Sequence, residues 1–405
     1  VGYSENGCIY NGKVCGRIQI KNCKNTGNIT FASELVSSDD EEQGAVNFGV
    51  YVSSGEIEVP DLPEDARDLG IHFIGGITGV NLQNETITHC TNTGSLSGFT
   101  GIGGVVGVNA GLVQRCELSE HFGNASLEYV GGIVGINAGT VQSCSTTAGK
   151  IITGNNHLGG IAGWNLNHGV LMYNTNYASI QASGKDAQGN AAVGGIAGQN
   201  SGVITLEQDQ TSVSRFVTGA GGAGVGGVIG INEVTGEIQT GQAKGTENET
   251  VAVSDKVTVQ GYEKVGGIVG INHGSCGQAE TNSYLSVKVQ KVQAFHGGAG
   301  GIAGITDGTV YYAVNRCETV SADAGNAGGI VAENHALIKN CNNYGNVSSS
   351  DGYAGGITAA NEGTLQLCRV NSNSQTAGTV EIYSRGEEVG GAVTATNTGT
   401  VTDCY

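Results

Sequence analysis

The chain has 405 residues, a formal net charge of −18 and 71 glycines, but only two prolines. So negative a charge argues against nucleic acid and anionic membranes as partners, because both carry charge of the same sign. No apolar stretch approaches the length of a membrane span and no signal peptide begins at Val1, so we expect no membrane insertion and a larger parent protein with other domains.

The first 30 residues precede any repeat, and we expect residues 1–30 to form an N-terminal coil or cap. They contain Cys8, Cys15 and Cys23, which makes this segment the better place to look for a disulfide. The chain has eleven cysteines, an odd number, so complete pairing within it is impossible.

An acidic segment without repeats covers residues 31–74 and has eleven of the 36 acidic side chains. The run Asp39, Asp40, Glu41 and Glu42 offers carboxylates of the kind that coordinate Ca²⁺. A solvated acidic loop explains the same composition, and we favour it because no EF-hand-like spacing is present. Ca²⁺ is therefore the one cofactor that the sequence leaves open.

A repeat fills residues 75–405, where a Gly-Gly pair opens a phrase close to Gly-Gly-Ile-Val-Gly-Ile-Asn eleven times. Repeats of this length stack on one another, because none can bury its own apolar face. The pairs start at Gly75, Gly103, Gly131, Gly159, Gly194, Gly226, Gly266, Gly300, Gly328, Gly355 and Gly390.

The unit 131–144 shows what each repeat builds. The apolar run Ile133 to Ile136 favours a buried strand of a parallel sheet, and residues 137–139 (Asn-Ala-Gly) favour a turn. Thr140 begins a second strand, and a variable third segment leads to the next Gly-Gly pair. We therefore predict an all-β fold, a single-stranded right-handed parallel β-helix (β-solenoid) of about twelve coils, with the hand taken from the general preference of crossovers.

Two rows of like residues are expected along this helix. One contains the Ile or Val that follows each Gly-Gly pair, as in Ile133 and Ile161. The other is an amide ladder at the corner, in which each Asn bonds the Asn of the next coil. Thr306 interrupts this ladder and Asn397 comes one residue late, so we expect irregular coils there. The ladder residues are Asn81, Asn109, Asn137, Asn165, Asn200, Asn232, Asn272, Asn334 and Asn361.

The pattern is compatible with either face of the Gly-Gly strand pointing inward. A Gly recurs two residues after the leading Ile, as at Gly107 and Gly135, and this small position suggests close packing inside a narrow coil. The residues in between would then point outward as an apolar stripe, although the reverse assignment fits the same pattern. The stripe would contain Val106, Val134, Ile229 and Val269.

Cysteines recur at stacked positions too. Cys116 and Cys144 lie thirteen residues after their Gly-Gly pairs, as do Cys341 and Cys368, while Cys404 is one residue off. We favour buried thiols there, because free Cys behaves as a small hydrophobe, with disulfides between coils as the alternative. The sequence does not assign the state of the remaining cysteines, among them Cys90, Cys276 and Cys317.

Longer insertions separate the repeats between residues 160 and 300, at 174–192, 205–224, 236–262 and 278–298. Insertions in solenoids collect on one side, often the binding side. Aromatic side chains there can stack on sugars or anchor a protein partner, or they can cap a small core of the insertion itself. The candidate ligand-binding residues are Trp164, Tyr173, Tyr177, Phe216, Tyr262 and Tyr284.

Motifs that carry catalysis are missing from the sequence. It contains no His-Glu-x-x-His, Cys-x-x-Cys or Gly-x-Ser-x-Gly pattern, and we expect no metal site and no catalytic residue. Glu207 with Asp209 is the one suggestive pair of carboxylates on a middle insertion, and exposed acidic pairs are common in proteins without activity.

Units such as 131–144, 328–346 and 355–368, with the closing run Cys341 to Val347, resemble GLUG-type repeats of bacterial surface proteins. The resemblance implies a secreted or wall-attached protein, either adhesin-like or the noncatalytic part of an immunoglobulin A metallopeptidase. It brings no catalytic motif that matches positions here.

We therefore expect a noncatalytic, extracellular β-helical segment of a bacterial surface protein that acts as an adhesin or binding scaffold. Its expected partners are a host glycoprotein, a glycan or an immunoglobulin. One alternative is a carbohydrate-active enzyme, a polysaccharide lyase or glycoside hydrolase, with its site on the side of the helix. The other alternative is the noncatalytic arm of a secreted peptidase.

Overall fold

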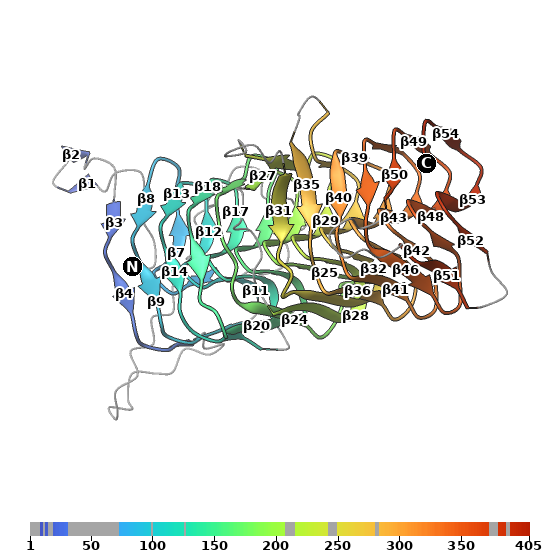
Figure 1. Ribbon diagram of the computed structural model, residues 1–405. Coiled ribbons are helices and arrows are strands. Elements are labelled where there is room, and N and C mark those ends of the chain that lie inside the picture. Colours follow the sequence, from blue (N-terminus) through green and yellow to red (C-terminus); the bar gives the residue numbers. More distant parts are fainter. Residues whose placement is uncertain are drawn as a thin grey trace.

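The computed structural model describes residues 9–10, 13–14, 19–30, 73–98, 100–124, 127–206, 215–241, 249–279, 283–371, 380–385 and 389–405. In these residues all regular secondary structure is β-strand, and successive coils pair in parallel. The chain forms a β-solenoid, which confirms the predicted fold class (Figure 1). Most of the acidic segment, including the candidate Ca²⁺ ligands at 39–42, lies outside the described residues.

The first sheet begins directly after each Gly-Gly turn, and each strand ends at the corner position of the Asn ladder. Its eleven strands are β7 (Thr78–Asn81), β12 (Val106–Asn109), β17 (Val134–Asn137), β22 (Ala162–Asn165), β26 (Ala197–Asn200), β29 (Ile229–Asn232), β33 (Val269–Asn272), β38 (Ala303–Thr306), β43 (Val331–Asn334), β48 (Thr358–Asn361) and β53 (Thr394–Asn397).

The second sheet follows the turn after the Asn, and its N-terminal strand belongs to the segment before the repeats. Its twelve strands are β3 (Gln19–Lys21), β8 (Thr86–Thr88), β13 (Leu112–Gln114), β18 (Thr140–Gln142), β23 (Val170–Met172), β27 (Val203–Leu206), β30 (Glu237–Thr240), β34 (Ser275–Cys276), β39 (Thr309–Tyr311), β44 (Leu337–Lys339), β49 (Thr364–Gln366) and β54 (Thr400–Thr402).

The third sheet leads back to the next Gly-Gly turn and contains the longest strands, β28 and β32. Its strands are β6 (Ile74–Gly75), β11 (Thr100–Gly103), β15 (Phe122–Gly123), β16 (Glu128–Gly131), β20 (Ile151–Gly154), β21 (Asn156–Gly159), β24 (Ser179–Ala182), β25 (Asn190–Gly194), β28 (Phe216–Gly226), β32 (Thr258–Gly266), β36 (Lys291–Ala294), β37 (Ala299–Gly300), β41 (Thr319–Ala322), β42 (Ala327–Gly328), β46 (Asn346–Ser349), β47 (Ala354–Gly355), β51 (Ile382–Ser384) and β52 (Gly390–Gly391).

Shorter sheets join the second sheet to the third. One contains β4 (Lys24–Asn25), β9 (Thr91–Asn92), β14 (Glu117–Leu118) and β19 (Ser145–Thr146), and another contains β31 (Glu249–Val253), β35 (Tyr284–Val287), β40 (Ala313–Asn315), β45 (Asn342–Asn343) and β50 (Arg369–Val370). Two pairs complete the described strands, β5 (Ile29–Thr30) with β10 (Leu96–Ser97), and β1 (Ile9–Tyr10) with β2 (Lys13–Val14), which is antiparallel.

Equivalent residues of consecutive coils lie side by side, as the repeat predicted. The amides of Ile133 and Val134 both donate to the carbonyl oxygen of Ile161, at 3.0 and 2.9 Å. The backbone therefore stacks coil on coil without a shift of register at the Gly-Gly turn, and each apolar residue meets its counterpart above and below.

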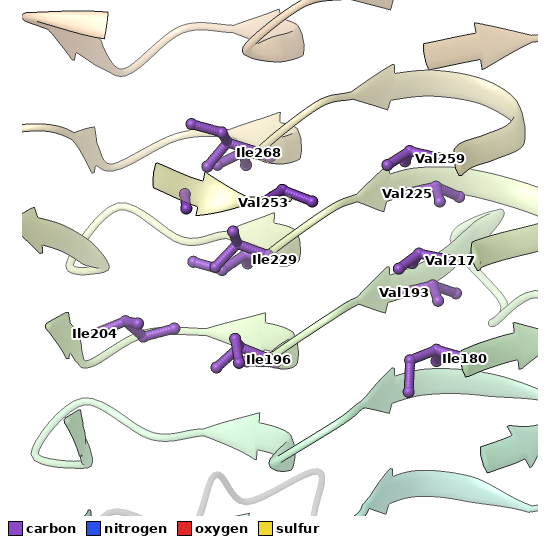
Figure 2. Packing of buried hydrophobic residues seen from close by; sticks show 14 of the residues in the cluster. Ile180, Val193, Ile196, Ile204, Val217, Val225, Ile229, Val253, Val259 and Ile268 are labelled. Atoms are coloured by element: carbon purple, nitrogen blue, oxygen red, sulfur yellow. The ribbon is translucent and has the colours of Figure 1, made fainter. Parts of the chain in front are cut away.

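The outward apolar stripe predicted after the Gly-Gly pair is wrong, because the leading Ile and the residue after it are both buried in the main core. Val106, Val134, Ile229 and Val269 are fully buried in the main core. Figure 2 shows Ile229 inside the coil with Ile196 and Ile268. The small residue beside them faces backbone, since a Cβ at Gly135 would lie 2.8 Å from both Ile102 N and Gly107 O.

The predicted amide ladder is present at the corner. The Asn165 side chain donates to Asn200 Oδ1 at 2.8 Å, and Asn200 donates to Asn232 Oδ1 at 2.8 Å. The expected irregular coils are not found: Thr306 accepts from Asn272 at 2.9 Å in register, and Asn397 pairs directly with Asn361. Asn397 is one residue late only when the repeat is counted from Gly390. In the structure Gly391 pairs with Gly355, so Asn397 is in register with Asn361.

A second row of buried asparagines was not predicted. Asn25 donates to Asn92 Oδ1 and Asn315 donates to Asn343 Oδ1, each at 2.8 Å. Asn343 lies against the second Gly of a pair, since a Cβ at Gly329 would overlap its amide group. The second Gly of the repeat therefore makes room for an interior amide, and elsewhere for an apolar side chain such as Leu118 against Gly104.

All described cysteines are free thiols. Cys116, Cys144, Cys341 and Cys368 are buried, which confirms the preferred interpretation of the stacked positions. A stacked sulfur accepts a hydrogen bond from the backbone N–H of the cysteine in the preceding coil. Cys116 N, for example, donates to Cys144 Sγ at 3.4 Å. Cys404 stacks on Cys368 in the same way, and Cys8 and Cys15 lie outside the described residues.

Thiol reactivity should report this packing. Burial raises the pKa of Cys276 to about 12, whereas Cys23 is exposed. Because the thiolate is the reactive species, we expect iodoacetamide at mildly alkaline pH to label Cys23 at least about 100 times faster than Cys276. Mass spectrometry of the labelled peptides measures both rates, with the guanidinium-unfolded chain as control. Equal rates in the native protein would contradict the buried position of Cys276.

Candidate functional site

The middle insertions build a broad, shallow depression on the outer surface of the third sheet, with a volume of about 1060 Å³. Its lining comes from β24, β28, β32, β36 and β41 and from the residues just before these strands. We call it the polar face. Its residues are Gln181, Arg215, Phe216, Thr218, Lys256, Thr258, Gln260, Gln290, Lys291, Glu318 and Thr319.

Strand alternation explains why these side chains point outward. Val217, Val259 and Val292 are fully buried and stack on one another in the core. Their neighbours along each strand must then project from the opposite surface, because successive side chains of a strand alternate. The same register aligns Thr218 with Gln260, and Phe216 with Thr258, so polar groups form rows across the coils.

The charge on the polar face differs from that of the whole chain. Three basic residues, Arg215, Lys256 and Lys291, line it together with one described carboxylate, Glu318, although the chain has a net charge of −18. The amides beside them are linked between coils, with Gln260 Nε2 donating to Gln293 Oε1 at 3.0 Å. The polar face therefore combines positive charge with many neutral hydrogen-bond donors and acceptors.

The predicted aromatic residues do not form one site. Phe216 alone among them lines the polar face. Trp164 is 8 % exposed and its ring stacks at 5.6 Å on Tyr129, so it is covered by the chain itself. Tyr284 contacts Tyr312 edge to face at 5.5 Å on a short sheet, and burial raises its pKa.

The other three aromatic residues are partly exposed but lie in different places. Tyr173 follows β23 at a corner with a positive φ of 57°, and Tyr177 precedes β24. Tyr262 is 40 % exposed and its ring lies 4.6 Å from that of His296. Scattered single rings of this kind are ordinary on a protein surface.

The residues that the sequence interpretation missed are the basic and amide side chains of the polar face. A signal was available, because Phe216-Val217-Thr218 and Thr258-Val259-Gln260 alternate polar or aromatic residues with a buried Val. That period of two marks a half-buried strand, whereas the aromatic residues of the insertions give no such period.

No cluster of three or more His, Cys, Asp or Glu side chains suited to a metal ion occurs in the described part of the chain. The carboxylate pair Glu207 and Asp209 lies outside it. Nor do the described residues include a helix long and apolar enough to cross a membrane.

The fold and the polar face define a β-solenoid with an open, polar depression on one side. Comparison with protein-family models, with curated proteins and with solved structures finds no match to this chain.

Proposed function

We propose that the protein is a noncatalytic binding scaffold of a bacterial cell surface, and that its polar face binds an acidic glycan. The observation that carries the proposal is the presence of Arg215, Lys256 and Lys291 together on one face of a strongly acidic chain. Guanidinium and ammonium groups form charge-assisted hydrogen bonds with carboxylate and sulfate oxygens, which are stronger than neutral ones.

The rest of the face suits a sugar polymer. Side-chain amides and hydroxyls, such as those of Gln260 and Thr258, can donate to or accept from sugar hydroxyls, and the Phe216 ring gives an apolar patch for a sugar face. The depression is shallow and crosses several coils, so an extended chain can lie along it. A compact small molecule would be bound better by a deeper pocket.

Hydrolysis is not supported by the described lining. A glycoside hydrolase needs two carboxyl groups roughly 5 to 9.5 Å apart across the scissile bond. Of the described residues that line the face, Glu318 is the one acid. The resemblance of units such as 131–144 to GLUG-type repeats favours an extracellular, adhesin-like role. The glycan would then belong to a host glycoprotein or to another microbe.

The test is binding to an array of acidic and neutral glycans, with reducing ends measured to detect turnover. We expect the triple variant R215A/K256A/K291A to weaken binding of acidic glycans at least about tenfold, since each charged hydrogen bond contributes about 1.5–3 kcal/mol. The control K21A/K24A/K339A removes the same charge elsewhere and should bind normally. Equal binding by both variants, or release of reducing ends, would contradict the proposal.

A further inference from the structure

A second row of apolar side chains runs along the outside of the main core, on the first sheet. It lies one residue before the corner position of the Asn ladder and has two apolar stretches. The first contains Val108, Ile136 and Trp164, and the second contains Ile231, Ile271 and Ile305. These stretches pack in two clusters separate from the core of the coil. Gln199 lies between them in the same register.

The chain covers the first stretch with its own rings. Phe73 and Tyr129 pack on Val108, Ile136 and Trp164. Tyr129 in turn stacks at 4.5 Å on His157 of the next coil, where burial lowers the pKa of the imidazole to about 4, so that it is neutral. Aromatic rings are therefore the natural cover for this row.

Among the described residues, no Phe, Tyr or Trp ring packs on the second stretch. In the register of the third sheet, Tyr129 and His157 are followed by Ala192, Gly224 and Lys264, all with positive φ. Gly224 leaves space beside Ile231 and Ile271, which are each 5 % exposed, since a Cβ there would lie 3.0 Å from Ile231 Cγ1 and 3.5 Å from Ile271 Cδ1. What remains is a cavity of about 210 Å³ above Ile231, Ile271 and Ile305, which we call the isoleucine groove.

One wall of the isoleucine groove is acidic. Glu233 and Asp307 line it, and each is held in place by a neighbour: Gln199 Nε2 donates to Glu233 Oε1 at 2.8 Å, and His273 Nδ1 lies 2.6 Å from Asp307 Oδ1. Lys264 is the one described ammonium group of the lining, which also contains the imidazoles of His273 and His335. The wall suits a cationic group placed beside an apolar one.

We propose that the isoleucine groove binds a segment of a partner protein that inserts an aromatic side chain beside a basic residue. The ring would lie on Ile231, Ile271 and Ile305 as Tyr129 lies on its own row, and the cation would meet Glu233 and Asp307. The volume agrees, because an apolar cavity of about 150 Å³ already accepts benzene. This site is independent of the polar face, because the two share no lining residue.

The experiment uses the full chain with labelled Ile methyl groups and a short probe, acetyl-Gly-Phe-Arg-Gly-amide, followed by NMR. We expect the δ1 methyl signals of Ile231, Ile271 and Ile305 to shift on titration. Probes with Ala for Phe, or Glu for Arg, should bind at least about fivefold more weakly, since each loses one of the two contacts. No shift at these methyls with the Phe-Arg probe would overturn the proposal.

Two variants locate the site. Lys264→Tyr places a ring in the conformation that Tyr129 already adopts (φ 53° at both positions) and should abolish the shifts by filling the groove. Lys339→Tyr, on the second sheet, is its control. E233Q/D307N should weaken the Phe-Arg probe and spare the Phe-Glu probe. Glu120→Gln, at a carboxylate that accepts from Lys150 outside the lining, should leave both unchanged. Normal binding by Lys264→Tyr would place the ligand elsewhere and refute the assignment.

Discussion

Replacing Gly131 by alanine is expected to lower the free energy of unfolding by about 3 kcal/mol or more, the upper part of the range for overpacked sites. A Cβ at Gly131 would overlap the carbonyl oxygen of Val134 and lie 2.8 Å from both Ala162 Cα and Gly163 N. These atoms belong to the backbone of the same turn and of the next coil, so they cannot rotate away as a side chain would. Urea unfolding followed by circular dichroism measures the loss.

The control for this prediction is Gly390→Ala. Gly390 begins a Gly-Gly pair in the sequence, yet the nearest atoms to a Cβ there are 3.8 Å away or more. We expect a change of less than about 0.5 kcal/mol, as for an ordinary surface substitution. If both variants lost the same stability, conformational freedom rather than close contact would explain the repeat glycines.

Removing one rung of the Asn ladder should have a comparable effect. Asn200→Leu leaves Asn232 Oδ1 and the carbonyl oxygen of Gly202 without their buried donor, at 2.8 and 3.1 Å in the native chain. Each unsatisfied buried group costs about 1–3 kcal/mol, so we expect a total loss of about 3 kcal/mol or more. The urea midpoint at constant slope is the measurement.

The chain supplies the matched control for the ladder as well. Thr306 already replaces an Asn and accepts from Asn272 at 2.9 Å while donating to Gly308 O at 2.9 Å. Asn200→Thr should therefore lose about half as much stability as Asn200→Leu, because a hydroxyl keeps one donor and one acceptor. Equal losses would show that shape, and not hydrogen bonding, fixes the corner.

The fold was predictable because each coil of a solenoid forms the same strands and turns from the same residues. The strand Val134–Asn137, found one residue later than the expected 133–136, the turn that follows Asn137 and the row of corner amides all follow from residues that recur at a fixed distance. Even the thiols could be placed, since Cys116 and Cys144 recur at one point of the coil and lie buried on each other.

The candidate sites were harder to predict, because they depend on which surfaces meet outside the coil. Trp164 was expected on the surface, but it is covered by Tyr129, a residue of the preceding coil that no pattern in the Gly-Gly phrase singles out. Arg215 and Lys291 are 76 positions apart in the sequence and line one face only because the coils stack.

The amino-acid sequence alone determined the stacking of coils, since glycine, β-branched residues and asparagine at a fixed period are compatible with little else. Tertiary structure decided that the leading Ile and the residue after it are both buried, and where the outer apolar row leaves a cavity. Those outcomes depend on contacts between coils, such as Gly135 against the backbone at Ile102 and Gly224 above Ile231. A one-dimensional period cannot encode them, because both faces of a strand carry the same repeat.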